Sequence, residues 1–293
     1  AARSRPRYAP IQADANTCAH GGSAGGSDPD VARRRAQPHS LRMDIICITF
    51  DWGDTLAANN GMPYLELHRR AIRRFGQELE LHGAVPQDWY DRAVGELEVI
   101  WHDTIDPLKN PEWREADLDA AIRGWVAYAG IADNEALRAA RTRMEQAWTD
   151  VVRPYGGAAE TLSRLKAMGY RIGILSHVAW PPEACRAWYR RWGMAESIDF
   201  YSLSSEVGWI KPNPAHYDHA IRLAGVPAGR ILHVGDHPTR DVIGAREHGM
   251  RTCLRLTQGI YDPAELACCK PDLQVGFVDE LPDLLDAHNQ TAG

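Results

Sequence analysis

The apolar positions of the chain fall into short continuous runs separated by stretches with helical periodicity. Five runs of four to six residues are rich in valine, isoleucine and leucine, at residues 45–50, 171–175, 198–201, 230–234 and 252–256. Continuous apolar runs of this length are typical of parallel strands covered on both faces. We therefore predict a parallel sheet buried between two layers.

Helical patterns lie between the later runs. Ala158, Leu162 and Leu165 fall on one face of a predicted helix, and Gly169 supplies a stop signal after it. The pattern before Gly249 ends in the same way. This alternation of strands and helices predicts a doubly wound, Rossmann-like α/β core.

The interval between the first two strands is about a hundred residues, which is too long for a structureless loop. Its periodicity predicts three or four helices, in residues 63–81, 87–103, 112–130 and 134–150. We therefore predict a core made of residues 43–57 and 153–288, with residues 58–152 inserted as an α-helical cap domain. Five of the ten tryptophans lie in this insert, where we expect most of them to form its core and one or two to line a pocket.

Residues 1–42 have no hydrophobic periodicity and include the sequence GGSAGGSDPD, which has the composition of a flexible linker. An export signal would require an apolar segment after its basic residues, and none follows the run Arg33-Arg34-Arg35. We predict that these residues form a disordered N-terminal extension.

Composition changes this picture little. The chain of 293 residues is 44% hydrophobic and 25% charged, as in ordinary globular proteins. No apolar run reaches about 18 residues, so we expect no membrane partner, and a net charge of −6 gives no reason to expect nucleic acid. The six cysteines show neither CxxC nor zinc spacing, which favours a reducing, cytoplasmic location. The oligomeric state stays open.

Polar residues follow the predicted strands at one edge of the sheet. The first strand ends at Asp51 and the second at Ser176. The fourth ends at Asp236, with Asp241 five residues later, and Lys211 lies between the third and fourth strands. Because ligands of open α/β sheets bind beyond the carboxyl ends of the strands, we expect these five side chains to meet.

This set of residues suits phosphoryl chemistry. Clustered carboxylates favour a hard divalent cation such as Mg²⁺, and a metal with a lysine can neutralise the oxygens of a transferring phosphoryl group. One carboxylate then remains free to attack phosphorus. Only four of the 33 basic residues are lysines, which favours a specific role for the compact charge of Lys211.

Four segments, in this order, resemble the motifs of the haloacid dehalogenase superfamily of hydrolases: FDWGDTL, RIGILSH, EVGWIKPNPAHYDHAI and HVGDHPTRDVIGAREHGM. The resemblance spans residues 44–286. It implies a phosphatase-like branch of the family, with a helical cap that sets specificity for small phosphorylated metabolites.

The resemblance also implies a role for each matched position. Asp51 would be the nucleophile and a metal ligand, and Asp236 and Asp241 would hold Mg²⁺ directly or through water. Ser176 and Lys211 would bind the transferring phosphoryl group, with Lys211 also stabilising the nucleophile. His177 would be a further substrate-binding residue.

The first motif departs from the family pattern. Phosphatases of the superfamily usually carry a second aspartate two residues after the nucleophile, as a general acid, and this chain has Gly53 there. The backbone carbonyl of Gly53 remains able to bind the metal. Asp54 stands one residue late: either it turns inward as the acid, or it is a turn residue. His177, where the family often has asparagine, is either an acid–base group or a pocket-lining residue.

We therefore expect a Mg²⁺-dependent phosphatase that forms an aspartyl-phosphate. One alternative is phosphonate-type or other C–X hydrolysis. Phosphonate cleavage needs a cap lysine, for which Lys109 is the only candidate, whereas the metal-free dehalogenases do not explain the Asp236 and Asp241 pair. The other alternative is a non-catalytic binding module, against which the retention of Asp51 and Lys211 argues.

Overall fold

The core is a six-stranded sheet in which all neighbouring strands run parallel, in the order β5-β4-β1-β6-β7-β8. We describe it from a computed structural model that covers residues 44–131, 134–257 and 261–290; the predicted N-terminal extension lies outside them. The strands are β1 (Cys47–Phe50), β4 (Arg171–Ser176), β5 (Phe200–Leu203), β6 (Ile231–Gly235), β7 (Arg251–Arg255) and β8 (Leu273–Val275).

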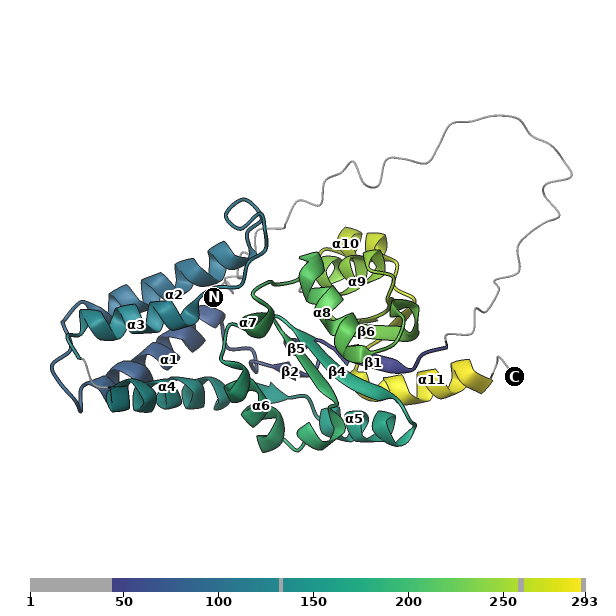
Figure 1. Cartoon of the computed structure of the whole chain (residues 1–293), viewed down its shortest axis with the longest axis horizontal. Coiled ribbons are helices and arrows are strands. Elements are labelled where there is room, and N and C mark those ends of the chain that lie inside the picture. Colours follow the sequence, from purple (N-terminus) through teal and green to yellow (C-terminus); the bar gives the residue numbers. More distant parts are fainter. Residues whose placement is uncertain (1–43, 132–133, 258–260, 291–293) are drawn as a thin grey trace, which may run out of the picture.

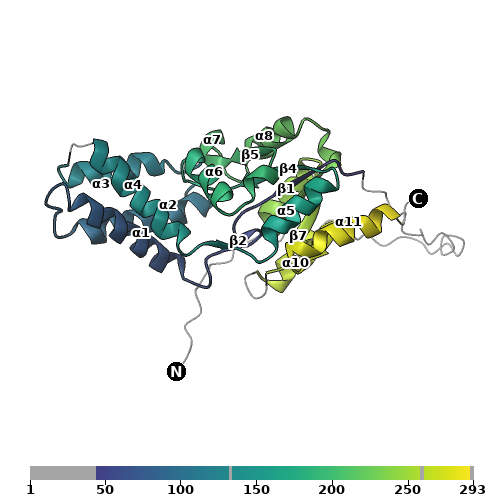
Figure 2. The same ribbon diagram turned by 90° about the horizontal axis from the view of Figure 1, so that it is seen from below.

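Alternating side chains of the sheet face two different helical layers. Ile48 and Phe50 of β1 pack with α5 (Ala158–Ala167) and α11 (Leu281–Gln290), which lie side by side in Figure 2. Cys47 belongs to the opposite cluster, with α8 (Pro214–Ala224) and α9 (Gly244–Glu247). This two-sided burial explains the continuous apolar runs and confirms the doubly wound α/β core.

The strand order reverses direction at β1. From β1 the chain reaches β4 and β5 on one side, and then crosses to β6, β7 and β8 on the other. Phe50, the last residue of β1, is in register with Ile174 of β4 and Val234 of β6. The carboxyl ends of these three strands are therefore neighbours at the switch point, where such sheets bind ligands.

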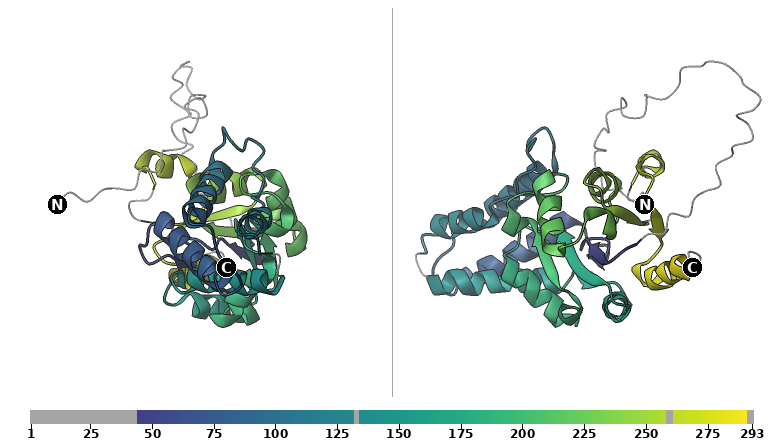
Figure 3. Two further views of the ribbon diagram at one scale, coloured as in Figure 1. Left: turned by 90° about the vertical axis from the view of Figure 1, so that its left-hand side faces the viewer. Right: turned by 45° about the vertical axis from the view of Figure 1, so that its right-hand side comes forward.

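A helical insert interrupts the core between two short strands. The strands β2 (Ala57–Ala58) and β3 (Arg153–Pro154) pair antiparallel. The chain between them forms the four helices α1 (Tyr64–Leu79), α2 (Trp89–Ile105), α3 (Leu118–Tyr128) and α4 (Asn134–Thr149). They lie together at one end of the molecule in Figure 1 and in front of the core in the left view of Figure 3. The inserted α-helical cap is thus confirmed, and its exact limits at residues 58 and 152 stay a prediction.

The cap has an aromatic core of its own. Phe75, Trp89 and Trp125 are fully or almost fully buried, and the two rings of Phe75 and Trp89 stack at 5.9 Å. The indole nitrogen of Trp89 donates to the carbonyl oxygen of Trp125 at 2.7 Å. These contacts account for the amphipathic pattern of the insert, because each helix buries one apolar stripe against its neighbours.

The structure adds elements that the sequence pattern did not predict. They include the strands β2, β3 and β8 and the helices α6 (Pro182–Arg191), α7 (Ser204–Val207), α8, α10 (Pro263–Cys269) and α11. The third strand begins at Phe200 rather than at residue 198, because the amide of Ile198 donates to Ala195 O at 3.1 Å and so closes the turn before the strand. No helix among the described residues is both long and apolar enough to cross a membrane.

A cap loop is fastened to the core by backbone hydrogen bonds. The amide of Glu115 donates to Gly208 O at 3.1 Å, and the amide of Ile210 donates to Trp113 O at 2.8 Å. The side-chain amide of Asn213 donates to Glu112 O at 2.7 Å. This loop therefore docks beside the segment that carries Lys211.

The Glu115 side chain reinforces this docking. Its carboxylate accepts a hydrogen bond from the Ser204 hydroxyl and lies 3.5 Å from His177 Nε2, and only 4% of the side chain is exposed. Burial alone would raise the pKa of Glu115, but His177, Ser204 and the Ala116 amide outweigh burial and lower the pKa. The carboxylate is thus the charged end of a cap–core contact.

We expect Glu115→Ala to lower the free energy of unfolding by about 1–3 kcal/mol, because Ser204 and His177 lose a charged acceptor. Urea denaturation measures this. Since the folded pKa lies below the ordinary value of about 4.3, the contribution should be complete above that pH and should disappear as the pH falls through the folded pKa.

Glu112→Ala in the same loop is the matched control. Glu112 pairs with Arg114 at the surface, with 64% of its side chain exposed, so its loss should change stability by less than about 0.5 kcal/mol. Equal effects of the two substitutions would contradict an anchoring role for Glu115.

Candidate functional site

Three carboxylates meet at the switch point of the sheet. Asp51 directly follows β1, Asp236 follows β6, and Asp241 lies in the wide helical turn η4 (Pro238–Ile243). One oxygen of each lies within 4.8 Å of the others. The amide of Asp51 donates to Val234 O at 2.9 Å, so β6 fixes the backbone at the position of the first carboxylate.

Lys211 joins two of these carboxylates. Its ammonium group donates to Asp51 Oδ1 at 2.9 Å, to Leu175 O at 3.0 Å and to Asp241 Oδ1. Burial of this side chain opposes the charged form, but Asp241 and Asp51 outweigh that effect and raise the pKa of Lys211. The lysine is therefore charged and held in place by three acceptors.

Asp241 is held from several sides. Its Oδ1 lies 3.1 Å from Nε2 of the buried His233, whose Nδ1 lies 3.0 Å from Thr49 Oγ1. Its Oδ2 accepts from the amide of His237 at 2.9 Å. A Cβ atom at Gly235 would lie 2.2 Å from Asp241 Cγ, which explains the glycine before Asp236. Both oxygens of Asp241 are thus oriented before any ligand arrives.

Asp236 has fewer polar partners than Asp241, and Lys211 is not among them. Tyr261 donates to its Oδ2 at 2.7 Å, and the Thr55 hydroxyl lies 3.5 Å from Oδ1. Burial, followed by the repulsion of Asp241 and Asp51, raises the pKa of Asp236 well above its ordinary value. In this environment the ionised form needs another positive charge nearby.

These residues fit a divalent cation. Three carboxylates face one ammonium group, so negative charge is in excess within a largely buried site. Mg²⁺ prefers oxygen ligands and is usually bound by one or two carboxylates together with water molecules. Asp236, Asp51 and Asp241 are therefore the residues that would hold it, and ligation by the Gly53 carbonyl stays a prediction.

The two residues that depart from the family pattern border a cavity next to this cluster. Gly53 and Asp54 both line it, and Asp54 has a left-handed backbone, with φ of 51°. The Tyr155 hydroxyl lies 3.5 Å from Asp54 Oδ1. Burial, partly offset by Arg255 and reinforced by Asp51, raises the pKa of Asp54. A Cβ atom at Gly53 would meet nothing within 4 Å, so packing does not require a glycine there.

The end of β4 supplies two further predicted residues. Ser176 is the last residue of β4, beside β1, and is buried. His177 follows it, lines the cavity and stacks on Trp101 at a centroid distance of 6.5 Å. The structure thus brings Asp51, Lys211, Asp236 and Asp241 into one cluster, with Ser176 on the strand next to Asp51 and with Asp54 and His177 at the cavity wall.

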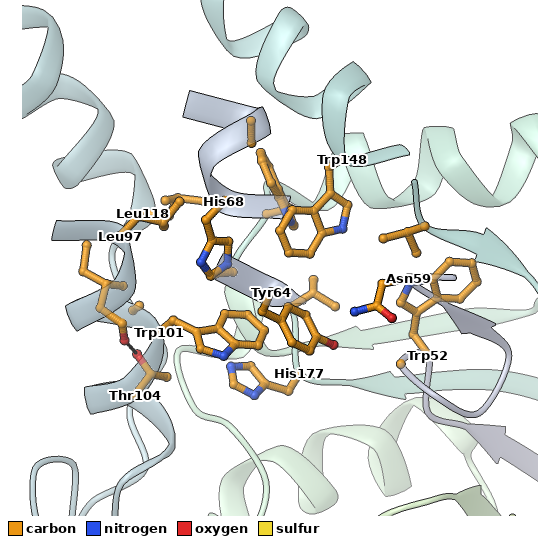
Figure 4. Close-up of a pocket in the computed structure, with 18 of the residues that line it drawn as sticks. Trp52, Asn59, Tyr64, His68, Leu97, Trp101, Thr104, Leu118, Trp148 and His177 are labelled. Carbon is orange, nitrogen blue, oxygen red and sulfur yellow. Dashed lines mark hydrogen bonds between the residues drawn. The ribbon is translucent and has the colours of Figure 1, made fainter. Parts of the chain in front are cut away.

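The cavity lies between cap and core and measures about 120 Å³. Figure 4 shows Trp101, Tyr64 and His68 of the cap together with His177 and Trp52 of the core around it. The cavity borders Gly53, two residues after Asp51, and His177, the residue after β4.

Several site residues escaped the sequence analysis. Thr55 lies within the quoted segment FDWGDTL without having been assigned a role, and His233 carries a weak signal as a polar residue within the apolar run 230–234. Tyr261 and Glu115 carry none, since they come from a late loop and from a helix-patterned insert. The expectation that one or two cap tryptophans line a pocket was confirmed, as Trp101 and Trp148 line the cavity. The expectation that most of them form the cap core was not, since only Trp89 and Trp125 of the five are buried.

Comparison with known proteins agrees with this geometry. A family model described as haloacid dehalogenase-like hydrolase matches residues 45–249. The glyceraldehyde 3-phosphate phosphatase of Methanothermobacter thermautotrophicus is 31% identical over 139 residues, which is 46% of this chain but only 58% of that protein. The human haloacid dehalogenase-like hydrolase domain-containing protein 3 is 30% identical over 76% of this chain and 86% of its own length.

A solved structure shares the fold over most of its length. The 2-haloacid dehalogenase of Pseudomonas syringae superposes with a TM-score of 0.58 at 24% identity, covering 83% of this chain and 99% of that one. Identity this low speaks to the fold alone. From the family match and the ordered motifs, the chain belongs to the haloacid dehalogenase-like hydrolases.

Proposed function

We propose that this hydrolase cleaves phosphoric monoesters of small metabolites in a Mg²⁺-dependent reaction through an aspartyl-phosphate at Asp51. The observation that carries the proposal is the buried cluster in which Lys211 bridges Asp51 and Asp241 beside Asp236. The methanogen relative, which is named as a phosphatase, supports this reaction class.

The proposed reaction has two displacements. A carboxylate oxygen of Asp51 attacks phosphorus, the ester P–O bond breaks, and the leaving oxygen takes a proton. Water then attacks the same phosphorus, the P–O bond to Asp51 breaks, and phosphate leaves with the carboxylate regenerated. Splitting the reaction in this way replaces one difficult step by two easier ones.

The residues of the chain have distinct tasks in this scheme. Lys211 fixes the rotamer of Asp51 and, with Ser176, would bind the phosphoryl oxygens. Mg²⁺, when held by Asp51, Asp236 and Asp241, would neutralise charge on the transferring group. The cap would limit the access of water, because residues of its helices and of its docked loop form part of the wall of the cavity that borders Gly53.

The phosphonate alternative finds less support. Lys109 is exposed and lies in the turn after α2, outside the residues that line the cavity. Schiff-base chemistry requires a lysine amine at the substrate, and among the described lining residues there is no lysine.

The nucleophile and the metal can be tested together. We expect Asp51→Asn to lower the release of phosphate from acetyl phosphate by at least about 10³-fold, with the thermal unfolding transition retained. Excess chelator should abolish wild-type turnover, and added Mg²⁺ should restore it. Asp44→Asn, which alters an exposed carboxylate paired with Arg230, is the control. Full activity in chelator would refute the metal requirement, and activity in Asp51→Asn would refute the mechanism.

The absent general acid is a separate question. The Tyr155 hydroxyl is positioned to hold Asp54, so we expect Asp54→Asn to slow hydrolysis of alkyl and aryl phosphates by similar, small factors. Gly53→Asp, which has room for its side chain, should speed alkyl phosphate hydrolysis by at least about tenfold, since a positioned acid is worth about 10²–10⁴. Steady-state kinetics on both esters measures this. A selective loss of alkyl phosphate hydrolysis in Asp54→Asn would instead make Asp54 the acid.

A further inference from the structure

The wall of the cavity between cap and core is dominated by aromatic rings. Six large aromatic residues line it: Trp52, Tyr64, Trp101, Trp148, Trp180 and Trp188. Three come from the cap helices and three from the core. Aliphatic side chains such as Leu97, Leu118 and Met144 fill much of the remaining wall. A pocket of this kind stabilises an apolar group by removing it from water.

The rings form a connected surface. Tyr64 and Trp101 stack with centroids 4.8 Å apart, and Tyr64 lies 6.4 Å from Trp148. Trp148 in turn lies 5.5 Å from Trp180 of the core. Tyr64, Trp101 and Trp148 are only partly buried, so part of their surface is available to a ligand ring, which aromatic faces and edges favour.

The polar side chains of the wall are already occupied. His68 pairs with Glu98, and burial, despite that partner, lowers the pKa of His68, so that its imidazole is neutral near pH 7. Asn59 donates to Met62 O and Thr104 donates to Ile100 O. A sugar or polyol would lose hydrogen bonds to water here without replacing them, at a cost for each unpaired group.

The charged side chains of the wall are two carboxylates, and both have partners. Glu115 is paired with His177 and Ser204, and Asp54 has the Tyr155 hydroxyl at 3.5 Å and the charge of Arg255 nearby. The described lining residues include neither lysine nor arginine. A second anionic group on the substrate would meet two carboxylates and no lysine or arginine among the described lining residues. A quaternary ammonium group would meet carboxylates that already have polar partners. An uncharged group is the best match.

The size of the cavity limits the group further. An engineered apolar cavity on the order of 150 Å³ holds benzene, and this cavity measures about 120 Å³. The cavity volume is therefore of the order that one six-membered ring needs.

We infer that the substrate is a phosphoric monoester whose alcohol carries one uncharged aromatic ring, which lies against Tyr64, Trp101 and Trp148. This inference rests on the proposed phosphatase function. Where the ring bears the ester oxygen directly, the inference also agrees with Gly53 at the position of the usual acid, because a phenolic leaving oxygen, with a pKa near about 10, departs with little help.

Ring recognition can be separated from leaving-group chemistry by comparing alkyl esters only. We expect kcat/KM for benzyl phosphate to exceed that for glycerol 3-phosphate and phosphocholine by about tenfold to a hundredfold, as burial of one ring allows. Acetyl phosphate, which has no ring, reports whether the core chemistry operates. Its hydrolysis without a preference for benzyl phosphate would overturn the inference and leave the proposed function standing. Preference for phosphocholine or for the glycerol ester would overturn it as well.

A binding measurement covers the case in which no ester is turned over. With Mg²⁺ present, calorimetry should show that benzylphosphonate binds at least about tenfold more tightly than methylphosphonate. Trp101→Leu should reduce this ratio by at least about fivefold. Tyr128→Leu, which removes an exposed cap ring outside the cavity, should leave it unchanged. Equal binding of the two phosphonates, or an equal effect of the two substitutions, would refute the aromatic pocket.

Discussion

The buried ammonium group of Lys211 is the interaction on which the site depends. It stands between Asp51 and Asp241 and also donates to the carbonyl oxygen of Leu175, the residue before the last one of β4. Without it, three carboxylates that each place one oxygen within 4.8 Å of the others would repel one another with no ammonium group between them. Parallel strands bring these groups together only because their carboxyl ends share one edge, so the sheet, the lysine and the acids form one arrangement.

The core was predictable because its signals are local. Runs such as 45–50 and 171–175 read as strands without knowledge of their partners, and Asp51, Ser176, Asp236 and Asp241 follow directly from where the strands end. The helices of the insert were equally visible in their apolar periodicity. Local patterns did not predict the short elements that depend on tertiary contacts. The strands β2 and β3 have two residues each, and each is a strand because it pairs with the other.

The pocket was much less predictable, because its walls come from residues far apart in the chain. Trp101 and His177 stack across 76 positions, and Ser204 meets Glu115 across 89. Periodicity places a tryptophan on a buried face, but it does not say whether that face meets another helix or a cavity. Trp89 and Trp125 pack inside the cap, whereas Trp101 and Trp148 line the cavity. Direction in space, rather than residue type, separates the two roles.

The antiparallel pairing of β2 with β3 has a consequence for the design of this molecule. Because Ala57–Ala58 and Arg153–Pro154 pair with each other, the chain enters and leaves the insert at adjacent points. A tight turn could join the two strands directly, so the connectivity of the sheet does not depend on the inserted cap. Substitution of the cap can then change which molecules are recognised, while the carboxylate cluster of the core stays the same.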